Sequence, residues 1–334
     1  MSKASEVNFE TTKGSTLSRL KENKLAPIEA IPTPFRSWNA ICGEEGGLIG
    51  IARKWMVTVG GITGTGKSYF VLNLAAHAVR MGKRVGMINI EMTQMAVATR
   101  FLTILTGIPK YKMEMGKNFS QDLWDAAHRK ADEIFEETGG TLITNESTVF
   151  SLEDVEESYR QLADAGCTMI ILDYAQLVGV AGVTDIFKRS EQVAYKLREL
   201  THKYNVTTLC VSQLKRADTK NRGKAPSIHD LMGGGCWEQV SHQIWLLNHT
   251  YRKKFGERPN GFHSGEYTEV LCGKNRSGIA PFDLPLRWTY ENMRFDEQAD
   301  VGGDERHAVE ITPEPEEACP HTGELFEEDY GSEP

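Results

Sequence analysis

The sequence of 334 residues has none of the segments that direct a chain to a membrane or out of the cell. No stretch approaches the roughly 18–20 consecutive apolar residues that a membrane-spanning helix needs. The first 24 residues are polar and contain no apolar core of a secretory signal. Acidic side chains at Glu6, Glu10 and Glu22 also argue against an organelle transit peptide. We therefore expect a soluble cytoplasmic protein with no membrane partner.

Closely spaced cysteines are also missing. The six cysteines are scattered along the chain, and no two form a CxxC pair. Cys210 and Cys272 lie inside apolar runs, as small core residues do. These features argue against a zinc site or a disulfide framework and indicate reduced thiols. At 40% apolar residues, a chain of this length can build a core without such crosslinks.

Positive charge is in deficit overall, but the net charge of −8 is unevenly distributed. Residues 296–334 contain 14 acids and one arginine, whereas the preceding 295 residues carry 37 Lys and Arg against 32 acids. This mildly basic body leaves nucleic acid open as a partner. The acidic, proline-containing tail is expected to be disordered. It either recruits a partner through Leu325, Phe326 and Tyr330, competes with nucleic acid for the body, or only keeps the protein soluble.

Apolar runs and helical spacing alternate along the body. The predicted strands are 55–59, 85–91, 141–144, 168–172, 206–212, 243–248, 269–273 and a last one near 286–290. The predicted helices are 68–81, 95–105, 120–137, 151–165 and 187–204. This alternation predicts an α/β fold with a mostly parallel sheet flanked by helices. The segment 43–47 is expected to be a loop, and residues 16–23 a helix too short to be stable alone.

The segment 61–68 (GITGTGKS) fits the P-loop pattern GxxxxGK[ST] and lies between a predicted strand and a predicted helix. Glycines let the backbone N–H groups face a phosphate chain, and the following helix adds its positive end. Lys67 would neutralise the β- and γ-phosphates of ATP, and the Ser68 hydroxyl would bind Mg²⁺. The expected nucleotide-binding residues are Gly61, Gly64, Thr65, Gly66, Lys67, Ser68 and Asp173.

Three other predicted strands end in polar residues. Asp173 is either an ordinary strand end or, beside a P-loop, the acid that with Ser68 holds the metal and its water shell. Glu91 is either a solvated strand end or the base that orients and deprotonates the attacking water. Gln213 is either a loop amide or a group that hydrogen-bonds the γ-phosphate and senses its loss.

Basic and glycine-rich segments follow the strand that ends at Gln213. They are either solvated, flexible loops or contacts for the phosphates of a nucleic acid. Farther along, Lys274 and Arg276 are either surface charges or a pair that reaches the γ-phosphate on a neighbouring subunit. The candidate DNA-binding residues are Lys215, Arg216, Lys220, Arg222, Lys224, Gly233, Gly234 and Gly235.

Together these segments resemble the motor domain of the DnaB-type (superfamily 4) hexameric replicative helicases, which has a RecA-like fold. The resemblance rests on the P-loop and on the segments NIEM at 89–92, IILDYAQL at 170–177, SQL at 212–214 and GKNRSG at 273–278. It extends from about Ala30, where AIPTPF is similar to the family's GIPTGF, to about Phe295. Arg100, RSEQ at 189–192 and WEQ at 237–239 also match the family's spacing.

The resemblance implies a Mg²⁺- and ATP-dependent ring that moves 5′ to 3′ on single-stranded DNA and unwinds duplex. It implies that Glu91 is the catalytic base, Asp173 the Walker B acid and Gln213 the γ-phosphate sensor. Lys274 and Arg276 would act in trans on the adjacent subunit. The segments 215–224 and 231–235 would line the channel of the homo-oligomer, expected to be a hexamer.

The expected organisation is an N-terminal segment (1–30) that docks on a neighbour, a motor domain (31–295) and the acidic tail (296–334). The short N-terminal part leaves no room for the family's collar or a fused primase, so a primase, a loader or a single-strand-binding protein would be separate partners. This compact organisation suggests a phage or plasmid origin. Two departures concern DNA contacts and packing: Met232–Gly235 replaces an Arg-Glu-Ser-Gly segment, and Val240 and His242 replace acids.

Two other functions are compatible with the residues alone. One is a RecA-like regulatory or recombination-mediator ATPase that binds DNA without unwinding it. The other is a subunit whose nucleotide only stabilises an oligomer, and the intact Lys67, Ser68, Glu91 and Asp173 argue against it.

Overall fold

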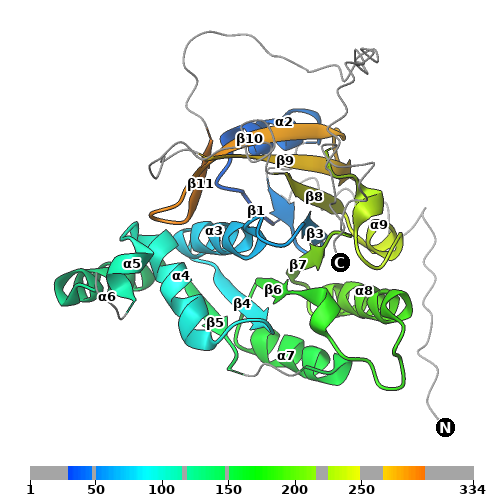
Figure 1. Cartoon of the computed structure of the whole chain (residues 1–334), viewed down its shortest axis with the longest axis horizontal. Coiled ribbons are helices and arrows are strands. Elements are labelled where there is room, and N and C mark those ends of the chain that lie inside the picture. Colours follow the sequence, from blue (N-terminus) through cyan, green and yellow to red (C-terminus); the bar gives the residue numbers. More distant parts are fainter. Residues whose placement is uncertain are drawn as a thin grey trace, which may run out of the picture. The chain divides into compact units, whose positions relative to one another are not determined.

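The computed structural model describes residues 29–46, 50–114, 119–146, 150–215, 225–248 and 266–297. Within these ranges, nine strands form one sheet in the order β11-β10-β9-β8-β3-β7-β6-β4-β5 (Figure 1). The six strands from β8 to β5 are parallel, and β9, β10 and β11 are antiparallel at one edge. The mostly parallel sheet expected from the sequence is therefore confirmed. The strands are β3 (Met56–Gly61), β4 (Arg84–Asn89), β5 (Thr141–Thr144), β6 (Met169–Asp173), β7 (Thr207–Gln213), β8 (Gln243–Asn248), β9 (Glu266–Asn275), β10 (Phe282–Thr289) and β11 (Arg294–Glu297).

Helices cover both faces of the sheet and enclose two apolar cores. Figure 1 shows α3 and α4 on one side of the strands and α7 and α8 on the other. The first core contains buried residues of α3, α4 and α6, and the second contains residues of α7, α8 and α9. These helices are α3 (Lys67–Arg80), α4 (Gln94–Thr106), α6 (Gln121–Thr138), α7 (Leu152–Asp164), α8 (Ile186–Lys203) and α9 (Cys236–Val240).

The helix boundaries follow from capping residues that are visible in the sequence. Thr93 and Ser120 accept hydrogen bonds from the backbone at the starts of α4 and α6. Both helices end at a glycine in the left-handed conformation, Gly107 and Gly139 respectively. The predicted elements therefore agree with the observed ones to within a few residues, and β5 and β8 have the predicted bounds.

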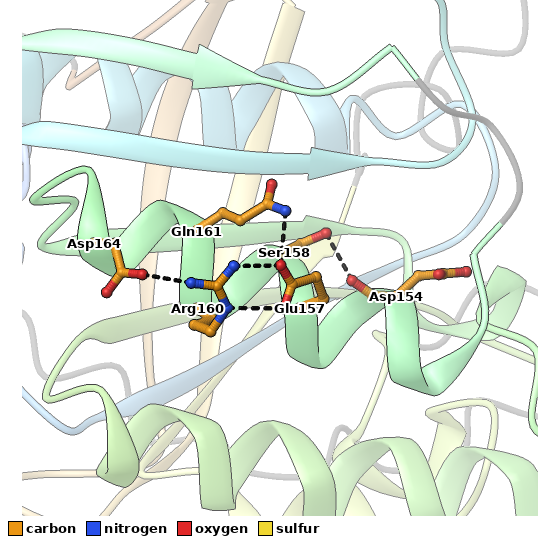
Figure 2. A network of polar contacts seen from close by, with 6 residues as sticks. All are labelled: Asp154, Glu157, Ser158, Arg160, Gln161 and Asp164. Atoms are coloured by element: carbon orange, nitrogen blue, oxygen red, sulfur yellow. Dashed lines mark hydrogen bonds and ion pairs between the residues drawn. The ribbon is translucent and has the colours of Figure 1, made fainter.

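The outer face of α7 is held by pairs within the helix itself (Figure 2). The Arg160 guanidinium contacts the carboxylates of Glu157 and Asp164, and Gln161 donates a second side-chain bond to Glu157. The Arg160 hydrogen bond lowers the pKa of Glu157 to about 2. Because these side chains are solvent-exposed, such pairs add little to stability, and we assign them to support of the helix alone.

The helix α2 (Arg36–Gly46) corrects the loop that the glycines of segment 43–47 predicted. Its stability comes from tertiary contacts that local composition does not reveal. Trp38 is buried and packs edge-on against Trp245, with 4.4 Å between ring centroids. The Glu297 carboxylate accepts bonds from the Arg36 and Ser37 amides at 2.9 and 2.8 Å, satisfying free N–H groups of the first turn.

Short elements absent from the sequence prediction complete the fold. The strands β1 (Ala30–Ile31) and β2 (Ile51–Ala52) pair separately, and α5 (Lys110–Met113), η2 (Ala175–Leu177) and η4 (Ile228–Asp230) are single turns. The predicted short helix at 16–23 and the residues of the acidic tail after 297 lie outside the described ranges. The strand β11 was not predicted, and it extends two residues beyond the expected motor boundary at 295. No helix within the described ranges combines the length and apolar character that crossing a membrane requires.

His242, which stands where the family has an acid, ties the start of β3 to the start of β8. Its Nδ1 accepts the Met56 amide at 3.1 Å, its own amide donates to the Met56 carbonyl at 2.7 Å, and its ring stacks on Trp55. Burial, reinforced by nearby Arg276, lowers the pKa of His242 to about 4. The neighbouring groups that add to this shift are His202, Arg198 and Lys274.

This shift predicts a pH-dependent contribution to stability. Below about pH 6.5 the unfolded chain protonates His242 while the folded chain does not until about pH 4, so stability falls across that window. His242→Asn keeps an acceptor near the Nδ1 position but cannot titrate. Between about pH 7 and pH 5 the wild type should lose about 1 kcal/mol more unfolding free energy than the variant, allowing for solvent screening. Chemical denaturation at both pH values measures this, and equal losses would contradict it.

Candidate functional site

The P-loop joins the end of β3 to the start of α3, as the sequence predicts. Gly64 and Gly66 have φ angles of 83° and 82°, which side chains other than glycine rarely adopt. A Cβ on Gly61 would lie 2.5 Å from the Thr65 hydroxyl oxygen, so this turn also needs a glycine. The loop therefore presents backbone N–H groups at a helix N-terminus, an arrangement suited to phosphate.

Lys67 lies at the centre of this loop. Its Nζ donates to the carbonyl oxygens of Gly61 and Ile62 at 2.8 and 2.9 Å. Burial lowers the pKa of the Lys67 ammonium, and the carboxylates of Asp173 and Glu91 act in the opposite direction. The ammonium and both predicted acids thus share one electrostatic environment, although they come from separate strands.

Asp173 ends β6 and is 1% exposed. Burial raises its pKa to about 6, Glu91 adds to this, and the Ser68 hydroxyl and the Lys67 and Arg100 charges oppose it. Among the described residues, neither carboxylate oxygen has a hydrogen-bond partner of good geometry, although Ser68 is near. A buried carboxylate with free oxygens beside a hydroxyl fits the oxygen ligands that Mg²⁺ prefers.

Glu91 lies two residues beyond β4, in a turn shaped by Asn89. The buried Asn89 amide donates to the Met92 carbonyl, and its Oδ1 accepts the Met92 N–H at 3.1 Å. The Ile90 amide donates to the Asp173 carbonyl at 3.0 Å, which joins the ends of β4 and β6. The exposed Glu91 carboxylate is thereby presented at the same edge of the sheet as Asp173.

These residues line one cavity of about 420 Å³. It brings together the predicted residues Gly64, Gly66, Lys67, Ser68, Glu91, Asp173 and Gln213, and it adds Thr63, Tyr69, Met92, Arg100 and Tyr174. The Arg100 guanidinium lies 4.7 Å from the centroid of the Tyr69 ring. Adjacency to Ser68 and Asp173 was the available signal for Tyr69 and Tyr174. Arg100 was visible only as part of the family pattern, without a role.

Gln213 connects this cavity to the glycine segment (Met232–Gly235). Its side-chain amide donates to the Thr63 hydroxyl in the P-loop at 2.7 Å, and its carbonyl accepts the Met232 amide at 2.8 Å. Gln176 is a second connection, because its Oε1 accepts the Gln213 amide at 3.1 Å and its Nε2 donates to the Met232 carbonyl at 3.1 Å. Gln176 is 7% exposed and was missed because nothing in its spacing marks it.

The glycine segment is packed against α8. Gly233 and Gly234 have positive φ angles, and a Cβ on Gly233 would meet the Ser190 Cβ at 2.5 Å. Within 4 Å of a Cβ on Gly235, no atom of the described chain is found. Lys215 is described and exposed. The other predicted basic residues lie outside the described ranges: Arg216, Lys220, Arg222 and Lys224.

Lys274 and Arg276 do not join the cavity. The Lys274 ammonium donates to the Glu238 carbonyl, and the Arg276 guanidinium donates to the Gln239 carbonyl at 2.6 Å. Because β9 is antiparallel to β8, its last residue Asn275 pairs with the first residue of β8. The P-loop follows the opposite end of the parallel strand β3, on the order of 15 Å away along the strand direction. The pair therefore lies at the edge of the sheet opposite its own P-loop.

Comparison with known proteins agrees with this architecture. The chain is 26% identical over 283 residues to a probable plasmid replicative DNA helicase of Chlamydia psittaci, covering 82% of this chain and 57% of that protein. It is 23% identical over 294 residues to the replicative DNA helicase DnaB of Helicobacter pylori, covering 76% and 58%. The chain thus spans somewhat more than half the length of these relatives.

Two solved structures share the fold. The ATPase domain of a phage helicase superposes with a TM-score of 0.73 at 20% identity, covering 87% of this chain and all of that one. A DnaB-like replicative helicase, studied with its interactions with primase, gives 0.72 at 20% identity and covers 86% and 69%. Residues 45–297 match the DnaB-like helicase C terminal domain, and the protein accordingly belongs to that family.

Proposed function

We propose that the protein is a ring-shaped replicative DNA helicase that hydrolyses ATP to translocate along single-stranded DNA and unwind duplex. Family membership favours this function over the regulatory or mediator ATPase that the residues alone left open. The observation that carries the proposal is the hydrogen-bonded connection from Thr63 through Gln213 to Met232. It joins a phosphate-binding loop to a glycine segment suited to a nucleic-acid backbone.

In the proposed reaction the P-loop amides and Lys67 bind the phosphates of ATP. Ser68 and Asp173 hold Mg²⁺, which supplies charge neutralisation at the β- and γ-phosphates. Glu91 orients the attacking water and accepts its proton. Gln213 is within reach of both the P-loop and the glycine segment, so movement at the γ-phosphate alters a contact to DNA.

The position of the basic pair supports assembly into a ring. Lys274 and Arg276 lie at the opposite edge of the sheet from the P-loop of their own chain. A head-to-tail contact brings such opposite faces together and closes into a ring, for which we propose six subunits. Arg276 then neutralises charge on the neighbour's γ-phosphate, with Lys274 beside it.

We propose that the basic and glycine segments line the channel of this ring. Contact with the phosphate backbone implies little sequence preference and strong salt dependence. The proposed direction is 5′ to 3′, the compartment is the cytoplasm, and the 1–30, 31–295 and 296–334 organisation is kept. The primase, loader or single-strand-binding protein would be separate polypeptides.

A subunit-mixing experiment tests the shared active site. Lys67→Ala removes the phosphate-binding ammonium, and Arg276→Ala removes the group acting in trans, so each variant alone should lose ATPase activity stimulated by single-stranded DNA by 100-fold or more, about the effect of an arginine finger. In an equal mixture, about a quarter of the interfaces combine an intact P-loop with an intact Arg276. Partial recovery of DNA-stimulated turnover is therefore expected.

The matched control is Arg287→Ala mixed with Lys67→Ala, because Arg287 lies on β10 outside both candidate sites. Arg287→Ala alone should retain stimulated turnover. If Arg276→Ala does so too, the trans-acting role is wrong. Turnover that ignores DNA in the wild type, or absence of duplex unwinding, would instead support a regulatory ATPase.

Gln176 offers a test of coupling between the two sites. Gln176→Met keeps the side-chain volume but removes the bonds to the Gln213 amide and the Met232 carbonyl. We expect the ratio of DNA-stimulated to basal ATPase rates to fall about tenfold, within the usual range of coupling energies between sites. Steady-state turnover with and without single-stranded DNA measures this ratio.

Ser212→Ala is the matched control, because it removes the Gln176 bond to the Ser212 hydroxyl at 2.8 Å and leaves the other two in place. It should keep the wild-type ratio. An equal proportional fall of basal and stimulated rates in Gln176→Met would mean that the residue only supports the fold.

A further inference from the structure

Phe187 is a half-exposed aromatic residue in the first turn of α8, with 50% of its surface accessible. In the part of the chain that the structure describes, it is the only exposed phenylalanine. The predicted DNA-contacting residues did not include it, and the nucleotide cavity does not use it. An apolar ring of this size in water is available to contact another molecule.

A cation and a bare backbone segment lie beside the ring. The Lys215 ammonium is 5.6 Å from the centroid of the Phe187 ring. A Cβ on Gly234 would lie 3.8 Å from the ring edge, so the glycine leaves this backbone open next to the ring. An aromatic face, a positive charge and an accessible backbone are the features that single-stranded nucleic-acid sites combine.

This cluster is attached to the connection between the two candidate sites. Lys215 is two residues beyond Gln213, and its amide donates to the Asp230 carbonyl at 2.7 Å. Gly233, next to Gly234, packs against Ser190 one turn after Phe187 on the same helix. A ligand on the ring would therefore touch the segment whose position Gln213 and Gln176 hold.

We propose that Phe187 stacks on a base of single-stranded DNA while Lys215 pairs with an adjacent phosphate. This inference rests on the proposed function and adds a base contact to a site otherwise built for phosphates. Because every base has a π-face, stacking on phenylalanine is tolerant of sequence. In duplex DNA those faces are covered by neighbouring bases, so the contact favours the unwound strand.

The test compares two strands of equal phosphate number, an oligothymidylate and an abasic deoxyribose-phosphate strand. The full-length chain is titrated onto each with Mg²⁺ and a non-hydrolysable ATP analogue, and binding is followed by fluorescence anisotropy. Phe187→Ala should weaken binding to oligothymidylate about tenfold, as expected for one lost base–aromatic stack, and leave the abasic strand unchanged. Lys215→Ala should weaken both strands and reduce the slope of log affinity against log salt by about one.

The chain offers a matched control in Tyr111, which is 47% exposed and has the Lys112 ammonium 5.5 Å from its ring centroid. It lies on α5, on the opposite side of the fold from α8 in Figure 1. Tyr111→Ala should bind both strands as the wild type does. Phe187→Trp should retain binding, and emission from the new indole should be quenched by oligothymidylate but not by the abasic strand.

Three results would overturn the inference in distinguishable ways. Wild-type affinity of Phe187→Ala for both strands would show that the ring does not contact bases. Equal loss of both strands, together with a smaller oligomer in sedimentation, would assign Phe187 to the interface between copies of the chain. A wild-type protein that binds neither strand would overturn the helicase proposal itself, and this contact with it.

Discussion

Parallel pairing of β3, β7, β6 and β4 is the constraint on which the candidate site depends. Because these strands run in one direction, the P-loop, Gln213, Asp173 and the turn carrying Glu91 reach the same edge of the sheet. The arrangement has an electrostatic cost, since Asp173 is buried with its oxygens unpaired and its pKa is raised. Lys67 and Arg100 offset part of that cost, and the remainder is suited to a divalent cation.

Local chemistry explains which parts of this structure could be predicted from the sequence. The helices α4 and α6 have a capping side chain at one end and a left-handed glycine at the other, so both bounds are written in nearby residues. The helix α2 and the strand β11 stabilise each other across about 260 residues, through Glu297 and the amides of Arg36 and Ser37, and no local pattern encodes that contact. The P-loop was visible because its function needs contiguous residues. Gln176 and Phe187 were not, because their partners are neighbours only in space.

The Met232 carbonyl is a fixed point for the proposed coupling. It accepts hydrogen bonds from both the Gln176 amide and the Trp237 indole, the latter at 2.9 Å. Trp237 is fully buried, so this carbonyl is anchored to the core on one side and to the nucleotide-sensing strand on the other. The loss of the family's arginine from this segment leaves the backbone to make the phosphate contacts. An aromatic neighbour would then supply affinity that the missing guanidinium does not.

The reversal of chain direction at β9 has a consequence for how ATP consumption is controlled. A subunit that carries its phosphate-binding loop on one edge and its basic pair on the other cannot close its own active site, whatever its internal motions. Under the proposed function, a free subunit is therefore half an enzyme, and turnover rises more steeply than linearly with protein concentration. The pool that is not assembled spends no ATP, so formation of the ring is itself the switch that turns hydrolysis on.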